Sequence, residues 1–571
     1  MAFFLRARAL SLVPNSFKYL KNYSLNALQR DIGAGVTVGI VALPLAMAFA
    51  IASGAGPQAG LFTAVVAGFI ISAFGGTRFQ IGGPTGAFVV IIAGVIGRSG
   101  YEGLLLATIL AGLLLVIMGL LGLGRLLQYI PYPVTAGFTS GIGLLIFTSQ
   151  IKDFLGLQVS LMPSAFVGQV ATCAQAMPTF APATLGIGAL TLAVMLTVRQ
   201  FIPRIPAPFA GILVGGAVAW GLGLDVETIG SRFGGIPATL PEFLPIAGVT
   251  LAKVRSVLPD ALSIAVLAGI ESLLSATVAD GMSGDRHSSS MELVAQGAAN
   301  IASSLFGGLP ATGAIARTAT NIRAGAFSPM AGMIHALTLV VFIKFMSPVA
   351  SIIPLSSLAA VLMVVAWDMS EPHRIKRLLF APKSDSMVML SAFGLTVFVG
   401  LTTAVEIGVV LSAILFMKRM SELVDIHSLD TGLPKEAIIS RRTGNPRVVV
   451  YEISGPLFFG MTHRFIDVMR FTRKKPEILV LCMRQVPTID ATGLEGLETV
   501  IRRSQRQGIR VILSGVHPTI MKVMKRMGTD QVVGRDNIFT DFSTAVSESL
   551  PSFTEDDSPA KVVKGKAAHY V

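Results

Sequence analysis

Two short stretches decide the fold. Residues 84–87 read Pro-Thr-Gly-Ala after a Phe-Gly-Gly at 74–76, and residues 311–314 read Ala-Thr-Gly-Ala after a Phe-Gly-Gly at 306–308. This pattern, followed by small and apolar residues, is typical of a half-length membrane helix that begins inside the bilayer at matching places in two repeats. Because helix starts carry unpaired N–H groups and a positive dipole end, two facing starts predict an anion site.

The composition places most of the chain in a membrane. Hydrophobic residues make up 52%, charged residues only 13%, and the mean hydropathy is +0.70. A soluble protein of 571 residues cannot keep that much apolar surface out of water. We expect a cytoplasmic N-terminal arm at 1–30, a transmembrane transport domain at 31–421, a cytoplasmic α/β domain at 437–551 and a disordered tail at 552–571.

The net charge is +13, and the basic residues behind it are distributed as in the loops of a membrane protein. Lysines and arginines concentrate in the N-terminal arm and in alternate loops, and the intervening loops are poorer in both. The positive-inside rule then predicts that both termini are in the cytoplasm, and so an even number of spans. We expect a multi-pass protein of the cell (inner) membrane. This distribution argues against a nucleic-acid partner.

Fourteen apolar segments are long enough to cross or enter the bilayer. The third (85–97) and tenth (313–323) are too short to cross, and both follow the duplicated motif. The fold class is therefore an α-helical polytopic membrane protein with a 7+7 inverted repeat, at about 31–224 and 257–421. The other segments are predicted at about 33–53, 58–74, 103–123, 133–155, 183–198, 208–224, 257–280, 292–306, 327–347, 353–368, 385–400 and 402–417.

The candidate substrate site is the backbone at the two half-helix starts. Free N–H groups can bind an anion only where no bulky side chain covers them. The competing interpretation is that Gly and Pro merely break helices here. The small residues proposed to bind the substrate are Thr85, Gly86, Ala87, Gly313, Ala314 and Ala316.

Arg317 follows these small residues directly and would add a full positive charge to the site. A guanidinium in the hydrocarbon region is costly and is rarely kept without a partner or substrate. The alternatives are a structural carboxylate partner or a side chain that snorkels to the surface. Phe49 could form a wall of the site, although most membrane Phe residues face lipid.

Glu271 is the acidic residue well inside the eighth span, and the offset between the repeats sets it opposite Pro44. A carboxylate isolated in a low dielectric favours its protonated form, so it can take up or release a proton as the site opens to either side. Proton coupling is therefore predicted. Sodium binding and a permanent ion pair with Arg317 are the alternatives.

The C-terminal domain alternates strand-like and helix-like segments, which predicts a small α/β fold with a mixed or parallel sheet. Strands are expected at 448–453, 478–483 and 511–513, and helices at 464–470, 494–507 and 519–527. Asp490 and Thr492 lie where a strand leads into a helix, and Thr492 could accept a phosphate. The simpler interpretation of this turn is a helix N-cap.

No enzyme activity is expected. The chain lacks a nucleophile with a positioned base, a metal-ligand cluster and a phosphate-binding loop, so no catalytic residue, metal or cofactor is predicted. The two cysteines, Cys173 and Cys482, fall in different regions and predict neither a disulfide framework nor a metal site.

The chain resembles the sulfate permease (SulP) family of anion transporters, with the STAS domain typical of that family at its C-terminus. Within the family, residues 151–158, 314–317, 365–367 and 369–371 resemble the bacterial aerobic C4-dicarboxylate branch. The stretches that carry the family resemblance are Leu43-Pro44, Ala48-Phe49-Ala50, Gly83-Pro84-Thr85, Glu271-Ser272-Leu273-Leu274, Ala279-Asp280-Gly281, Gly307-Gly308, Ala316-Arg317 and Asp490-Ala491-Thr492-Gly493.

The resemblance implies a core domain that moves like an elevator against a gate domain, with the anion between the third and tenth segments. Carried over by position, Phe49, Thr85, Ala316 and Arg317 line the site, and Glu271 holds the acidic coupling position. The sodium-dependent bicarbonate branch has Asp in place of Glu271 and Thr in place of Ile315, which favours a proton here. Mammalian relatives have Gln at the position of Leu45, and related STAS turns can carry Ser where Thr492 stands.

The predicted function is secondary active transport of sulfate, a C4-dicarboxylate or bicarbonate, with the proton as coupling ion. The alternatives are a passive or exchanging channel-like pathway regulated by the STAS domain, and a sensor in which transport is vestigial. Nucleobase transporters can share the 7+7 plan, but by the family resemblance the STAS tail and Arg317 favour inorganic or carboxylate anions. The resemblance further implies a homodimer, and a cytoplasmic protein partner of the STAS domain is possible.

Overall fold

The chain forms two compact units, Met1–Ser412 and Ala413–Val571. The computed structural model describes residues 12–20, 23–124, 131–159, 162–163, 165–202, 205–236, 238–245, 249–422, 425–428, 448–458, 476–542 and 544–545.

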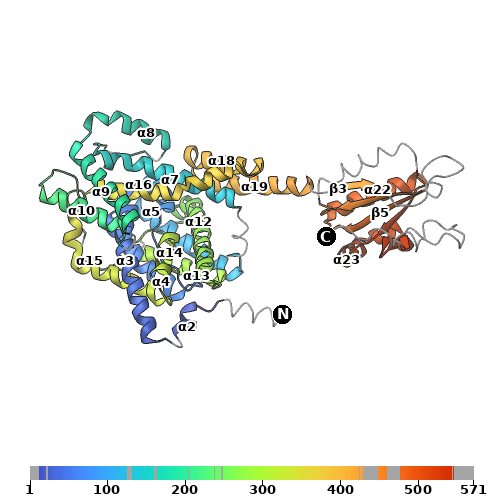
Figure 1. The fold of residues 1–571 in the computed structure, drawn as a ribbon, viewed down its shortest axis with the longest axis horizontal. Coiled ribbons are helices and arrows are strands. Elements are labelled where there is room, and N and C mark those ends of the chain that lie inside the picture. The colour runs from blue at the N-terminus through green and yellow to red at the C-terminus, as the bar shows by residue number, and fades with distance from the viewer. Residues whose placement is uncertain are drawn as a thin grey trace. The chain divides into compact units, whose positions relative to one another are not determined.

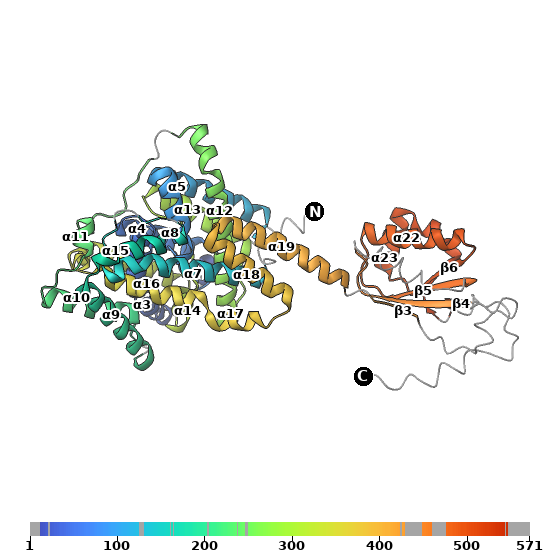
Figure 2. The same ribbon diagram turned by 90° about the horizontal axis from the view of Figure 1, so that it is seen from above.

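The first unit is a bundle of apolar helices (Figures 1 and 2). Among the described residues, seven helices are long and apolar enough to cross a membrane: α3 (Leu25–Ala52), α4 (Pro57–Phe74), α5 (Gly86–Leu121), α7 (Tyr132–Leu155), α9 (Pro182–Phe201), α12 (Leu251–Ser283) and α15 (Met330–Ser351). Other helices fill the remaining predicted segments: α10 (Ala207–Gly221), α13 (Ser289–Leu305), α14 (Ile315–Arg323), α16 (Leu355–Ser370), α18 (Lys383–Phe398) and α19 (Leu401–Glu422).

The two predicted half-helices are both present. The helix α14 has only nine residues. The helix α5 runs through the predicted third and fourth segments, but Gly100 interrupts it with non-helical dihedrals (φ 68°, ψ −179°), which only glycine adopts readily. With α5 counted as two parts, the described helices occupy all fourteen predicted segments, which confirms the predicted fold class.

Two helices start well before their predicted first residues. The helix α3 starts at Leu25, inside the stretch predicted as the N-terminal arm, because the Ser24 side chain accepts a hydrogen bond from the Ala27 N–H and caps it. The helix α12 starts at Leu251 rather than near 257, and Thr250 caps it in the same way through Lys253. Polar N-caps outside the apolar run extend both helices beyond the hydrophobic pattern.

The helices of the first unit pack as two groups. The core group joins α5 to α12 and α13, and α15 to α3 and α4, with α14 against α12 and α3. The gate group joins α7 to α16 and α18, and α9 to α10 and α16. Within the core, α5 and α13 approach closely because both carry glycine at the contact: a Cβ at Gly112 would lie 2.6 Å from the Gly297 carbonyl oxygen.

A short N-terminal helix, α2 (Asn15–Leu20), packs at the C-terminal end of α4. Asn15 Nδ2 donates to the Gly76 carbonyl at 2.6 Å, and Ser16 Oγ donates to the Ala73 carbonyl at 2.6 Å. Tyr23 donates to the buried carboxylate of Asp31 at 2.7 Å, and burial together with that carboxylate raises the pKa of Tyr23. The described part of the N-terminal arm is therefore attached to the core group.

In the described part of the second unit, the strands form a five-stranded sheet of order β3-β4-β5-β6-β7. The strand β3 (Asp425–Ser428) pairs antiparallel with β4 (Val448–Ser454), and β5 (Ile478–Gln485), β6 (Arg510–Ser514) and β7 (Ile538–Phe539) continue in parallel. The helices α22 (Ala491–Arg506), α23 (Pro518–Met527) and α24 (Thr529–Val533) follow the strands. Figure 2 shows α22 and α23 on one face of this sheet.

This unit confirms the predicted α/β class, with one difference in extent. Its sheet includes residues 425–428, which precede the predicted domain start at 437, because β3 adds the antiparallel edge strand. The apolar side chains of one sheet face bury against the helices, with Leu481, Leu497 and Leu513 almost fully buried. The helix predicted at 464–470 and the tail at 552–571 lie outside the described residues.

Candidate functional site

The two duplicated motifs meet as a short antiparallel ladder. The strand β1 (Gly82–Gly83) pairs with β2 (Thr312–Gly313), so that Gly82 faces Gly313 and Gly83 faces Thr312. These residues come from the two predicted repeats and are fully or largely buried. The ladder therefore joins the two half-helix starts inside the core group.

Each half-helix begins directly after the ladder. Thr85 is the N-cap of α5 and Ala314 is the N-cap of α14, and neither side chain caps its helix. The Ala314 N–H donates instead to the Ile81 carbonyl at 2.8 Å, across the repeats. Since the first N–H groups of a helix have no intrahelical partner, two sets of backbone donors lie close together here.

Arg317 extends from one half-helix to the start of the other. Its side chain is 3% exposed, and Nη2 donates to the carbonyl oxygen of Pro84. Its Nη1 is buried and has no hydrogen-bond partner among the described residues. A buried guanidinium donor without a partner is costly, and a bound anion would remove that cost.

Glu271 also contacts the start of α5. Thr85 Oγ1 donates to Glu271 Oε2 at 2.9 Å, which explains why Thr85 does not cap its own helix. None of the ion pairs among the described residues joins Glu271 to Arg317. The permanent ion pair between these two groups, one of the alternatives for Glu271, is therefore not present in this structure.

Apolar side chains from three helices cover the start of α5. A Cβ at Gly86 would lie 3.3 Å from Phe49 Cε1, 3.2 Å from Ile146 Cδ1 and 2.8 Å from Met369 Sδ. Phe49 is on the core helix α3, whereas Ile146 and Met369 are on the gate helices α7 and α16. The α5 start therefore lies where the core group meets the gate group.

The predicted site residues are thus largely brought together: Phe49, Thr85, Gly86, Glu271, Gly313, Ala314 and Arg317 lie at or beside the ladder. Ala87 is fully buried inside α5, whereas Ala316 is exposed on α14. In the second unit, Asp490 Oδ1 accepts a hydrogen bond from the Gly493 N–H at 2.6 Å, which makes it an N-cap. Thr492 is exposed on the first turn of the same helix, and its regulatory role stays a prediction.

Sequence reasoning missed a buried polar cluster behind the ladder. Glu292 is fully buried, and its two carboxylate oxygens accept hydrogen bonds from Thr77 at 2.8 Å and from Gln80 at 2.9 Å. Gln80 is the residue two positions before the ladder, so this cluster fixes the β1 strand. The signal was present in the sequence, because Glu292, Gln296 and Asn300 form a polar stripe with four-residue spacing in an apolar helix.

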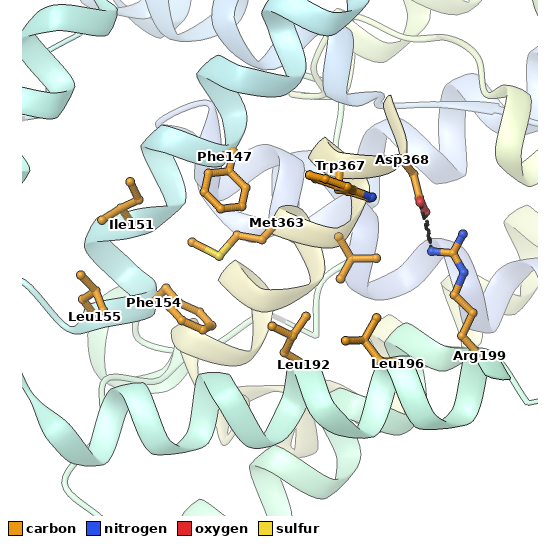
Figure 3. Close-up of a pocket in the computed structure, with 11 residues that line it drawn as sticks. Phe147, Ile151, Phe154, Leu155, Leu192, Leu196, Arg199, Met363, Trp367 and Asp368 are labelled. Atoms are coloured by element: carbon orange, nitrogen blue, oxygen red, sulfur yellow. Dashed lines mark hydrogen bonds and ion pairs between the residues drawn. The ribbon is translucent and has the colours of Figure 1, made fainter. Parts of the chain in front are cut away.

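Two described cavities lie away from the ladder. One, of about 680 Å³, is an apolar groove between α7, α9 and α16, and Figure 3 shows the side chains that line it. A second, of about 330 Å³, lies between α3, α10 and α15. Within the described part of the chain, no group of three or more His, Cys, Asp or Glu side chains could hold a metal ion.

Comparison with known sequences identifies the family of this chain. Residues 28–392 match the Sulfate permease family, and residues 441–545 match the STAS domain. The chain belongs to the sulfate permease family. It is a multi-pass membrane protein with a C-terminal STAS domain, as predicted.

Two relatives of this sulfate permease chain cover almost its whole length. The YvdB protein of Bacillus subtilis, which carries a provisional sulfate-transporter name, is 41% identical over 91% of this chain and 97% of its own. Bicarbonate transporter BicA of Synechocystis is 32% identical over 93% of this chain and 97% of its own. Both names are those of transporters rather than enzymes, in agreement with the prediction. Neither name mentions a dicarboxylate, so that substrate stays a prediction.

Solved structures agree on the fold. The transmembrane domain of a cyanobacterial bicarbonate transporter BicA is 30% identical, with a TM-score of 0.60 over 68% of this chain and 98% of that one. A murine Solute Carrier 26 family anion transporter in the inward-facing state has a TM-score of 0.83 over 96% of this chain and 95% of that one. Its identity of 17% supports the fold alone.

Proposed function

We propose that this protein is a secondary active transporter of a small anion, coupled to protons, in the cell (inner) membrane. The observation that carries the proposal is the antiparallel ladder Gly82–Gly83 with Thr312–Gly313, which joins two half-helix starts beside a buried, partly unpartnered Arg317. Sulfate, bicarbonate and a C4-dicarboxylate are the candidate substrates. The first two are named in relatives, and the third comes from the sequence resemblance.

The electrostatics of the site favour an anion over a neutral or cationic solute. Two helix N-termini supply partial positive charge, and the guanidinium of Arg317 supplies a full one. In a buried site these charges are weakly screened and therefore attract a negatively charged ligand strongly. Backbone dipoles and one arginine recognise charge more than its carrier, so a single site of this kind can accept several dianions.

Glu271 is proposed as the proton-coupling group. It is half-buried beside the α5 start, and its contact with Thr85 links its charge to the helix that holds the anion. Because Glu271 contacts the N-cap of α5, a negative Glu271 would repel an anion bound to the N–H groups of that helix. A proton on Glu271 therefore favours anion binding. Anion and proton would then cross together.

An elevator movement is proposed for the transport step, in which the core group slides against the gate group. The separate packing of the two groups supports it. The apolar cavity of about 330 Å³ between the core helices α3 and α15 and the gate helix α10 supports it further, because loosely packed apolar surfaces can slide. The charge of the loops further supports cytoplasmic termini. The family resemblance supports a homodimer, and a cytoplasmic protein partner of the STAS domain is proposed with it.

Uptake into liposomes tests the proposal. Purified protein is reconstituted, and uptake of labelled sulfate, bicarbonate and succinate is measured with and without an inside-alkaline pH gradient. We expect at least one of these anions to accumulate with the gradient above its level in protein-free liposomes, where bicarbonate already collects because CO2 crosses the bilayer. If none of the three moves, the transport proposal is wrong.

Variants separate the coupling from the transport. Glu271→Gln is expected to lose accumulation driven by the pH gradient. Glu242→Gln, which changes an exposed carboxylate in the connection between the repeats, is expected to keep it. If Glu271→Gln still concentrates substrate with the gradient, only the coupling role is lost. A passive channel, the main alternative, would give downhill flux in both variants and no accumulation in the parent protein.

A further inference from the structure

The apolar groove between α7, α9 and α16 has one charged end. Arg199 near the C-terminal end of α9 and Asp368 near the C-terminal end of α16 form an ion pair of 3.0 Å there, as Figure 3 shows. From Leu192 to Arg199 the groove follows α9 for about 10 Å. Its remaining lining is apolar, with Phe147 and Phe154 on α7 and Met363 and Trp367 on α16.

The guanidinium at this end can hold a second anion. Both carboxylate oxygens of Asp368 accept from the same nitrogen of Arg199, Nη1, at 3.0 Å. Within the described part of the chain, no contact uses Nε or Nη2 of Arg199, and the side chain is 58% exposed. An exposed ion pair of this kind contributes little stability, so a phosphate can bind the open donors beside Asp368 or in exchange for it.

More positive charge follows directly after the ion pair. The helix α17 (Pro372–Leu379) starts four residues after Asp368 and carries Arg374, Lys376 and Arg377. Phe380 at its end is 83% exposed. A short amphipathic basic helix with an exposed aromatic residue is typical of the membrane interface, where basic residues attract anionic lipids.

We propose that this groove binds one anionic phospholipid from the surrounding bilayer, with its phosphate on Arg199 and an acyl chain along the apolar lining toward Phe154. The groove belongs to membrane-spanning helices, its long wall is apolar, and its charged end is at the interface, which is the charge pattern of a phospholipid. The site is separate from the ladder that holds the anion in the proposed function.

The position of the groove gives such a lipid a structural role. Ile146 is adjacent to Phe147 on α7, and Met369 is adjacent to Asp368 on α16. The first residue of each pair approaches Gly86 at the anion site, and the second lines the groove. The lipid would therefore contact α7 and α16 on the side opposite to the residues that face the anion site. Any effect of the lipid on transport rests on the proposed function.

The two tryptophans of the chain make a direct test possible. Trp367 lines the groove and Trp220 lies on α10, so a Trp220→Phe variant reports on the groove alone. The full-length variant is placed in phosphatidylcholine bilayers that contain a small fraction of phosphatidylglycerol or phosphatidylcholine with brominated acyl chains, which quench tryptophan on contact. We expect brominated phosphatidylglycerol to quench Trp367 at several-fold lower mole fraction than brominated phosphatidylcholine.

Three further variants in this background decide the outcome. Arg199→Gln is expected to reduce the preference about five-fold, the effect of about one basic contact near an anionic lipid, and Asp368→Asn to increase it because a competing carboxylate is removed. Arg323→Gln, which removes an exposed arginine on α14, is expected to leave the preference unchanged. Equal quenching by both lipids, no quenching by either, or equal losses in Arg199→Gln and Arg323→Gln would overturn the proposal. A decrease of the preference for phosphatidylglycerol in Asp368→Asn would also overturn it. The Asp368→Asn variant therefore tests the proposal even if Arg199→Gln does not fold. These readouts do not depend on transport.

Discussion

At the scale of single residues, the site depends on where side chains are small. Gly83 leaves room for the Arg317 guanidinium, since a Cβ at Gly83 would lie 2.7 Å from Nη1. Its φ of 146° is in the region that favours glycine. Arg317 in turn donates to the Pro84 carbonyl, just before the other half-helix begins. The absence of a side chain at Gly83 thus allows the guanidinium of Arg317, from the second repeat, to contact the first repeat.

Arg317→Gln is expected to reduce anion uptake about 10- to 100-fold, because charge-assisted hydrogen bonds contribute about 1.5–3 kcal/mol. Arg317→Lys keeps the charge but not the planar fork, so an intermediate loss is expected. Initial uptake rates in liposomes at several substrate concentrations measure both. Wild-type rates in Arg317→Gln would contradict the role of this residue in anion binding.

Gly83→Ala is expected to lower both the thermal stability and the uptake. The new Cβ displaces the guanidinium, and the strained dihedral costs about 1–3 kcal/mol. Gly97→Ala, on the half-helix that follows Gly83, is the control, because a Cβ there has no atom within 4 Å and the residue is helical. Melting temperatures in detergent compare the two. The same melting temperature for both variants would show that the space at Gly83 is not required.

At the scale of elements, close helix approach and buried polar side chains hold the half-helices in place. The helices α5 and α13 contact through Gly112 and Gly297. From α13, Glu292 fixes Gln80 beside the ladder, and Asn300 donates to the Ala311 carbonyl at 2.9 Å on the other side. A single helix of the second repeat therefore supports both strands of the ladder.

Gly112→Ala tests this helix contact. The added Cβ would lie 2.6 Å from the Gly297 carbonyl oxygen, so α5 and α13 must separate, at a cost of about 1–3 kcal/mol. A melting temperature several degrees lower is expected in detergent. Gly186→Ala on α9 has no atom within 4 Å of its Cβ and is expected to be neutral or slightly stabilising. Equal stability of the two variants would mean that the helices tolerate the extra group.

At the scale of the whole molecule, the charge of the loops predicts which parts face the cytoplasm. An even number of spans places both termini on one side and the connection between the repeats, at 225–250, on the other. The two native cysteines are both buried, and replacing them leaves only the introduced cysteine to react with a label. The topology can therefore be measured with single cysteines.

Single cysteines at each terminus and at Glu242 are introduced in a Cys173→Ala, Cys482→Ala background. A membrane-impermeant maleimide added to intact cells is expected to label Glu242→Cys and neither terminal cysteine until the membrane is permeabilised. Labelling of one terminus from outside would contradict an even number of spans. Labelling of both would mean that the orientation is inverted.

The sequence by itself determined the membrane class, the fourteen segments, the two half-helix starts and the strand-helix order of the STAS domain, because these depend on local hydrophobicity and on backbone-breaking residues. It also identified Thr85, Glu271 and Arg317, since polar groups in apolar segments stand out. Only the tertiary structure paired Gly83 with Thr312, directed Arg317 to Pro84 and placed Ile146 and Met369 over Gly86. Contacts between distant segments depend on how helices pack, and lipid-compatible residues look alike in sequence whether they face lipid, a groove or a substrate.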